Sequence, residues 1–163
     1  MITHLFLDID GVLAVASDRL VHRFRTFSPS PAAEFLRLLT AVPSLKLVIS
    51  SSWRKTDFGR KKLDRAFDTW GLPHDRIAGM TGKRLDGARG LEIASYLKEH
   101  SLDWENIVVL DDETCDMPAV PQSSIVKVTF DDGLTTAAAD TIIARCQASL
   151  INTKRHVQQI QFS

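Results

Sequence analysis

The chain has 163 residues, with 20 basic and 20 acidic side chains and a formal net charge of zero. This length suits one domain with its own hydrophobic core, and the balanced charge excludes a global field that would attract nucleic acid or a membrane. Two cysteines, Cys115 and Cys146, exclude a disulfide framework and lack the spacing of a metal site. The N-terminus does not resemble a signal peptide, and no apolar run approaches the roughly 18–20 residues that cross a bilayer. We therefore predict a cytoplasmic protein with reduced thiols and no membrane partner.

In chain order, the first element is an apolar run at residues 5–7. It predicts a strand buried on both faces, because its residues do not alternate between polar and apolar. A helix follows, with apolar residues at positions 35, 38, 39 and 42, Ser30 as its expected N-cap and Pro31 as its first residue. A second strand at residues 45–49 and a helix with apolar positions 63, 66, 67 and 70 come next, and Gly71 is a helix stop signal.

The second half of the chain begins with a weaker strand near residues 77–78. A helix with apolar positions 91, 94 and 97 follows, for which Asp86 is the expected N-cap. Strands are expected at residues 107–110 and 125–128, and a last helix at positions 134, 138, 142 and 146. Residues 152–163 lack a clear period and are expected to form a C-terminal tail after a domain of residues 1–151. Alternating strands and helices predict a three-layer α/β fold with a mostly parallel sheet.

Chemically active side chains follow three of the predicted strands. They are Asp8 and Asp10, then Ser50, Ser51, Trp53 and Arg54, and finally Asp111, Asp112 and Asp116. Ligands of open α/β sheets bind beyond the carboxyl ends of the strands, so these groups are expected to converge. Converging carboxylates repel each other and lose solvation, and Mg²⁺, which prefers oxygen ligands, would offset that cost. Zinc would call for Cys or His ligands, and the predicted cluster contains neither.

Each of these patterns also has a purely structural interpretation. An Asp-Gly pair after a strand, as in Asp10-Gly11, is often a turn. The serines after the second strand often serve as an N-cap or loop. Asp8 favours a functional site, because it extends an apolar strand where an unpaired charge is costly. The acidic pair that follows residues 107–110 also favours a functional site.

Three motifs in the same order resemble those of the haloacid dehalogenase (HAD) superfamily. LFLDIDGVL resembles the first motif, LVISSS the second and VVLDDETCD the fourth. The resemblance implies a doubly wound, Rossmann-like sheet of about five parallel strands in the order 3-2-1-4-5. It also implies a Mg²⁺-dependent phosphatase that works through an aspartyl-phosphate.

The family's roles carry over residue by residue. Asp8 would be the nucleophile and a metal ligand, and Asp10 the general acid and base, with its main-chain carbonyl also on the metal. Asp111 and Asp112 would be further metal ligands, with Asp116 outside them. The phosphate-binding hydroxyl would belong to Ser51, or to Ser50 if the register differs by one residue.

The third HAD motif is a Lys or Arg near the start of the helix before the strand at 107–110. Lys83 and Arg89 are both candidates for this phosphate-binding cation. Arg89 is favoured, because it lies in the first turn of the predicted helix. A cation there opposes the helix dipole, so an anionic partner is expected nearby.

A longer set of sequence segments resembles a narrower group within this superfamily. ISSSWR, LDGARGLEIASYL and VVLDD together resemble HAD domains related to those of Swiss Army Knife RNA-repair proteins, which trim nucleic-acid ends. The two gaps in which HAD proteins insert a cap domain are too short for one here. The resemblance therefore implies an open site for bulky phosphoesters or nucleic-acid ends.

Residues near the expected site leave several interpretations open. The loop 17–27 carries four basic side chains and two phenylalanines, which suit either a nucleic-acid backbone or a solvated loop. Trp53 is expected in the core or as a stacking platform, and Arg54 as a phosphate clamp or the partner of an acid. Alternatives to a phosphatase are a phosphotransferase, a non-catalytic binding protein of the same fold, or a glycosyltransferase that holds metal through Asp-x-Asp.

Overall fold

The computed structural model describes residues 1–16, 27–83 and 88–161. Its sheet has five strands, all parallel, in the order β3-β2-β1-β4-β5. The strands are β1 (His4–Leu7), β2 (Lys46–Ile49), β3 (Ile77–Met80), β4 (Ile107–Asp111) and β5 (Ile125–Lys127). The predicted α/β fold and the predicted strand order are confirmed.

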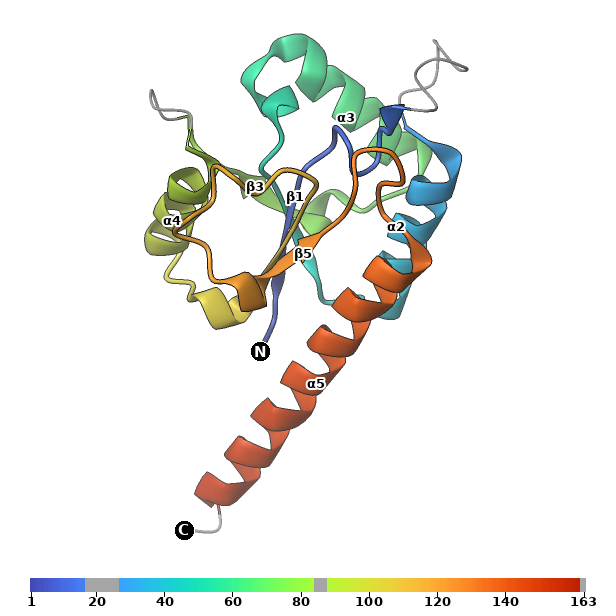
Figure 1. The fold of residues 1–163 in the computed structure, drawn as a ribbon. Helices are drawn as coiled ribbons and strands as arrows, with labels where there is room; N and C mark the ends of the chain where they lie inside the picture. Colours follow the sequence, from blue (N-terminus) through green and yellow to red (C-terminus); the bar gives the residue numbers. More distant parts are fainter. Residues whose placement is uncertain (17–26, 84–87, 162–163) are drawn as a thin grey trace.

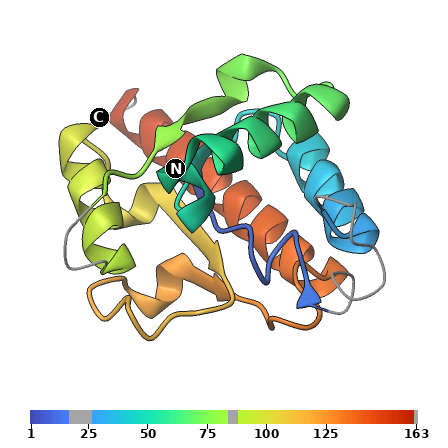
Figure 2. The ribbon, with the colours of Figure 1, turned by 90° about the horizontal axis from the view of Figure 1, so that it is seen from above.

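Helices cover both faces of this sheet, as Figures 1 and 2 show. The longer ones are α2 (Pro29–Ala41), α3 (Asp57–Thr69), α4 (Arg89–Glu99) and α5 (Thr136–Gln161). Short 3-10 helices are η1 (Ser52–Lys55), η2 (His74–Arg76), η3 (Trp104–Asn106) and η4 (Gln122–Ser124). The core on one face joins the sheet to α2, α3 and α5, and the core on the other joins it to α4. The result is the three-layer arrangement that the alternating elements predict.

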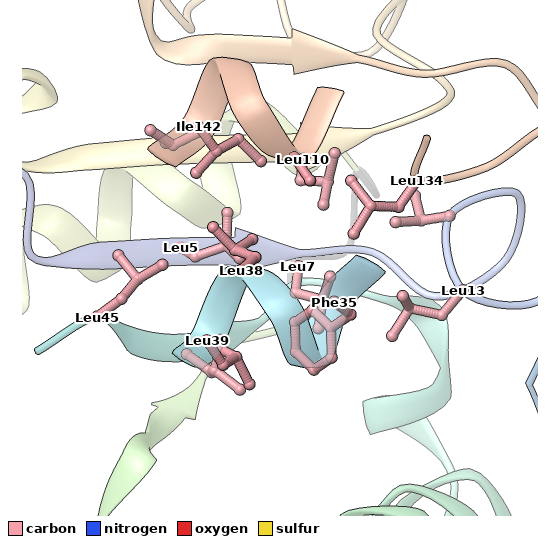
Figure 3. Packing of buried hydrophobic residues seen from close by; sticks show 14 of the residues in the cluster. Leu5, Leu7, Leu13, Phe35, Leu38, Leu39, Leu45, Leu110, Leu134 and Ile142 are labelled. Carbon is pink, nitrogen blue, oxygen red and sulfur yellow. The ribbon is translucent and has the colours of Figure 1, made fainter. Parts of the chain in front are cut away.

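The central strand β1 supplies both cores. Leu5 and Leu7 belong to the cluster with α2 and α5, whereas Phe6 belongs to the cluster with α4, because successive side chains of a strand point to opposite faces. All three are fully buried. Figure 3 shows the first cluster, in which Leu38 of α2 and Ile142 of α5 pack on either side of the β1 leucines. The uninterrupted apolar run of β1 follows from burial on both faces.

The first long helix begins earlier than its sequence predicts. α2 starts at Pro29 with Ser28 as its N-cap residue, whereas Ser30 and Pro31 were the expected cap and start. Both prolines lie in the first turn, where backbone N–H groups have no intrahelical acceptor and a proline therefore costs little. The Ser28 hydroxyl accepts a hydrogen bond from the backbone N–H of Val15 at 3.0 Å instead of capping the helix.

Helix α4 buries a different face from the predicted one. Ile93, Tyr96 and Leu97 are buried, whereas Leu91 is 40% exposed. Packing against Phe6 and the neighbouring strands selects this face. The expected N-cap, Asp86, lies outside the described residues, and Ala88 immediately precedes the helix.

The last helix continues through most of the segment for which the sequence predicted a tail. α5 runs to Gln161, and Figure 1 shows its C-terminal part extending beyond the sheet and the other helices. Extending a helix that has already nucleated adds one hydrogen bond per ordered residue, which requires no apolar period. The domain end at residue 151 stays a prediction.

The two gaps in which a cap domain could be inserted are occupied by ordinary elements of the fold. Within the described residues, α2 lies between β1 and β2, and η1, α3, η2 and β3 lie between β2 and α4. No separate cap domain occurs in these parts of the chain. None of the described helices is both long and apolar enough to span a bilayer, and a cytoplasmic location stays a prediction.

Candidate active site

The sheet register brings the ends of three strands together. Leu7 of β1 is aligned with Ile49 of β2 and with Leu110 of β4. The ladder continues one residue further, since the Asp8 N–H donates to the Leu110 carbonyl at 3.1 Å and the Ser50 N–H donates to the Leu7 carbonyl at 3.0 Å. The next residues along the three strands therefore meet at one edge of the sheet.

Three carboxylates meet at this edge. Asp8, Asp111 and Asp112 each offer a ligand oxygen, and these atoms lie within 4.8 Å of one another. Asp8 is 4% exposed and Asp111 is fully buried. Burial, followed by the charge of Asp8, raises the pKa of Asp111 to about 7, and the same two causes raise the pKa of Asp112. The proximity expected of these three carboxylates is confirmed.

The turn after Asp10 allows the close approach of Asp112. Gly11 has a φ of +70°, and its N–H donates to the Ala14 carbonyl at 2.9 Å. A Cβ at this position would lie 2.2 Å from the Asp112 Oδ2. Only glycine tolerates both the backbone conformation and the contact. Asp10-Gly11 thus forms a turn, and that turn makes room for a carboxylate of the cluster.

Arg89, the first residue of α4, points into the acidic cluster. Its Nη1 lies 3.0 Å from the Asp8 Oδ2 and also hydrogen-bonds the Asp111 Oδ2. Burial opposes the positive charge, but the two carboxylates outweigh it and raise the pKa of the guanidinium. The anionic partner expected for a cation at a helix N-terminus is therefore present as two carboxylates. Lys83, the other candidate, is exposed.

Asp116 supports the helix that carries Arg89. Its Oδ2 accepts the Arg89 N–H at 3.4 Å, and its carbonyl accepts the Gly90 N–H at 3.3 Å. Both N–H groups belong to the first turn of α4, where no intrahelical acceptor exists and a negative charge is favoured. Asp116 is absent from the group of close carboxylates, in line with the outer position expected of it.

Asp10 lies beside Trp53 rather than in the cluster of close carboxylates. The Trp53 Nε1–H donates to the Asp10 Oδ2 at 2.9 Å. Trp53 itself is partly buried against Phe27, with ring centroids 5.8 Å apart and an interplanar angle of 24°. The indole therefore packs against the core and bonds to the site at the same time.

Two serines follow β2 beside the end of β1, and their hydroxyl groups differ in their partners. Ser50 and Ser51 are both fully buried. The Ser51 Oγ accepts the Trp53 N–H at 3.4 Å and caps η1. The Ser50 Oγ has no hydrogen-bond partner among the described residues. A buried hydroxyl without a partner is costly, so Ser50 is the serine better suited to contact a ligand.

The sequence matches a family of known proteins. The model of HAD domains in Swiss Army Knife RNA repair proteins matches residues 4–139.

The chain belongs to this HAD family.

Among solved structures, a haloacid dehalogenase-like family hydrolase from Streptococcus pneumoniae is similar, with a TM-score of 0.48 and 13% identity over 86% of this chain and 90% of that one. No curated protein sequence matches the chain significantly.

Arg54 of this HAD domain uses all of its side-chain N–H groups in hydrogen bonds within the protein. The five N–H groups of Arg54 donate to four backbone carbonyls and to the Glu92 carboxylate. The carbonyls belong to Ser50, Ser51, Thr81 and Gly82. A guanidinium has five donors, so the structure leaves none for a phosphate clamp. Arg54 instead ties the end of β2 to the segment after β3.

Glu92 is the site-supporting residue that the sequence analysis missed. It is 2% exposed and pairs with Arg54, and Lys55 lies 3.7 Å away. The sequence contained a sign of this burial, because the helical spacing places Glu92 on the same face of α4 as Ile93, Tyr96 and Leu97. The predicted apolar positions of this helix, 91, 94 and 97, did not include Ile93 and Tyr96, and so this signal was missed. Most of the loop 17–27, including its basic side chains, lies outside the described residues, and only Phe27 can be placed.

Proposed function

We propose that this HAD domain is a Mg²⁺-dependent phosphomonoester hydrolase with Asp8 as its nucleophile. The observation that carries the proposal is the meeting of Asp8 with Asp111 and Asp112 within 4.8 Å. Arg89 faces this cluster at 3.0 Å from Asp8. A buried carboxylate held between other acids and a cation suits attack on a phosphorus atom whose oxygens need neutralising.

The residues present fit Mg²⁺. The cluster offers carboxylate oxygens alone, which this ion prefers. Its burial raises the pKa of Asp111 to about 7, with a further contribution from Asp8, as expected of carboxylates arranged for a cation. Asp8, Asp111, Asp112 and, from the family resemblance, the main-chain carbonyl of Asp10 would hold the ion. When bound, Mg²⁺ would neutralise phosphate oxygens and orient the substrate.

The proposed reaction has two steps, both performed by residues of the chain. In the first, an oxygen of Asp8 attacks phosphorus while Asp10 gives its proton to the departing ester oxygen. In the second, Asp10 takes a proton from water, which attacks phosphorus and releases phosphate from Asp8. Arg89 and a hydroxyl, Ser50 in preference to Ser51, would hold the phosphate oxygens.

We further propose that the substrate is bulky, with nucleic-acid ends as the favoured class. Two observations support this. The described residues contain no cap domain that would enclose a small substrate, and the matching family model describes domains of RNA repair proteins.

The test is hydrolysis of an aryl phosphate with and without Mg²⁺. We expect a Mg²⁺-dependent rate that Asp8→Asn abolishes, because an amide is not a nucleophile. Asp64→Asn, on the exposed face of α3, is the matched control and should retain the wild-type rate. Activity without Mg²⁺, or retained in Asp8→Asn, would contradict the proposal.

Two further measurements separate the alternatives. Beryllofluoride with Mg²⁺ mimics an aspartyl-phosphate and should raise the melting temperature of the wild type but not of Asp8→Asn. Stabilisation without turnover of any phosphoester would indicate a binding protein. Transfer of the phosphoryl group to an added alcohol in preference to water would indicate a phosphotransferase. A screen of oligonucleotide 3′ and 5′ phosphates, nucleotides, sugar phosphates and phosphopeptides tests the substrate class.

A further inference from the structure

The indole N–H of Trp53 is directed at the carboxyl group that the proposed reaction uses as acid and base. Trp53 lies in η1, after β2, and Asp10 follows β1, so the contact spans 43 positions of sequence. Its length, 2.9 Å between Nε1 and Oδ2, is that of an ordinary hydrogen bond. We propose that Trp53 is a positioning residue, which fixes the orientation of the Asp10 carboxyl group. This inference rests on the proposed phosphatase function.

The indole is held from several sides. Its ring stacks on Phe27 at 5.8 Å, and the Lys62 Nζ lies over it at 5.3 Å. On the backbone side, α3 approaches so closely that a Cβ on Gly59 would lie 2.2 Å from the Trp53 carbonyl oxygen. These contacts fix the direction of the N–H without help from Asp10. A donor fixed in this way can orient the carboxyl group to which it is hydrogen-bonded.

The chemistry of the two groups determines the direction of this hydrogen bond. Indole is a donor only, so the Asp10 Oδ2 must be the acceptor. The contact therefore fixes where one oxygen of the carboxyl group lies relative to the indole.

The proton balance of the proposed reaction involves Asp10 and not Trp53. In the first step a proton moves from the Asp10 carboxyl group to the ester oxygen as the P–O bond breaks and the bond from Asp8 to phosphorus forms. In the second step water loses a proton to the Asp10 carboxylate as its oxygen bonds to phosphorus and the Asp8 bond breaks. Asp10 and Asp8 both return to their starting states, and Trp53 exchanges no proton.

The test measures kcat/KM for phosphate esters with leaving groups of increasing basicity. Trp53→Phe retains a ring and removes the donor. We expect it to lower kcat/KM by about 10- to 100-fold for an alkyl phosphate, which needs a proton on the leaving oxygen. For 2,4-dinitrophenyl phosphate, which does not, the loss should be below about twofold. With that substrate kcat should still fall and a burst should appear, because Asp10 also activates water in the second step.

The matched control is Trp70→Phe. Trp70 belongs to the same aromatic cluster and packs on Phe27 at 5.1 Å, so this variant removes an indole from the cluster and leaves the one at Asp10. Its kcat/KM should stay near wild type across the series. In an Asp10→Asn background, Trp53→Phe should add no further dependence on the leaving group.

Several outcomes would overturn the inference. An equal loss for all leaving groups would mean that Trp53 serves stability alone, and no loss at all would mean that Asp10 is oriented without it. If Trp53→Phe does not fold, 3-benzothienylalanine at position 53 keeps the ring shape, lacks the N–H and faces the same criteria. Failure of the proposed function is a separate result, because it appears as an inactive wild type or an active Asp8→Asn.

Discussion

Replacing Arg54 with Met should lower the free energy of unfolding by about 3–5 kcal/mol, the cost of removing one partner from a buried ion pair. Arg54 is 5% exposed and its partner Glu92 is 2% exposed. Methionine keeps the apolar stem, so the loss comes from the Glu92 charge that loses its buried partner and from four carbonyls that each lose one donor. Against a typical total of 5–15 kcal/mol, this is a large fraction.

The assay is urea unfolding followed by tryptophan fluorescence, with the slope checked for two-state behaviour. Arg37→Met is the control, since Arg37 also binds two carboxylates, Glu34 at 2.8 Å and Asp140 at 2.7 Å. The ion pairs of Arg37 lie on the surface, where such pairs contribute little to stability. The urea concentration at the midpoint of unfolding should therefore be almost the same in Arg37→Met as in the wild type. A second experiment combines Arg54→Met with Glu92→Met, which removes the buried charge that lost its arginine partner and should recover part of the lost stability.

Two results would refute this reasoning. The first is a loss below about 1 kcal/mol in Arg54→Met, which is the range of exposed ion pairs. The second is a double variant no more stable than the single one, which would mean that the buried charge of Glu92 is not what destabilises Arg54→Met. The first result would also mean that Arg54 does not stabilise the connection between the end of β2 and the segment after β3.

Three other predictions concern the site itself. Gly11→Ala should weaken Mg²⁺ binding, because its Cβ would lie 2.2 Å from the Asp112 Oδ2 and its φ would be +70°. The assay is the rise in melting temperature on adding Mg²⁺, and a rise equal to that of the wild type would contradict this prediction. The Mg²⁺ affinity measured by calorimetry should fall about tenfold per pH unit below about 7, because Asp111 must lose its raised-pKa proton to bind. By the same linkage, the metal-free protein should lose stability as pH rises from about 4 to about 7, since the folded state holds a proton that the unfolded state has released. Asp111→Asn should weaken this dependence and leave the contribution of Asp112, whose pKa is also raised. Arg89→Met should lower kcat/KM for an aryl phosphate by about 10²–10³-fold, whereas Lys83→Met should change it little; the reverse order would assign the cation role to Lys83.

Much of the architecture follows from local sequence patterns. Apolar runs without alternation mark strands covered on both faces, and helical periods between them require parallel crossovers. Acids that directly follow such runs must lie at the carboxyl edge of the sheet. The meeting of Asp8 with Asp111 and Asp112 could therefore be predicted from positions in the sequence, although they are about 100 residues apart.

Other features depended on contacts that leave no local trace. The helical period of α4 was recognised, but of the predicted apolar positions Leu91 is exposed and Leu97 is buried. The period alone does not say which of two overlapping helix faces packs against the sheet. That error hid Glu92, the buried partner of Arg54 at a separation of 38 residues. The choice between Lys83 and Arg89 likewise needed the position of the α4 N-terminus relative to Asp8.

By itself, the sequence determined the fold class and the edge at which the acids gather, because burial and chain direction impose these on each strand separately. The strand order followed from the resemblance to HAD proteins. The tertiary structure alone decided how the polar groups pair: Arg89 with Asp8 and Asp111, Arg54 with Glu92, and the Trp53 indole with Asp10. A hydrogen bond requires a particular distance and direction between two side chains, and these exist only after the separate elements have packed.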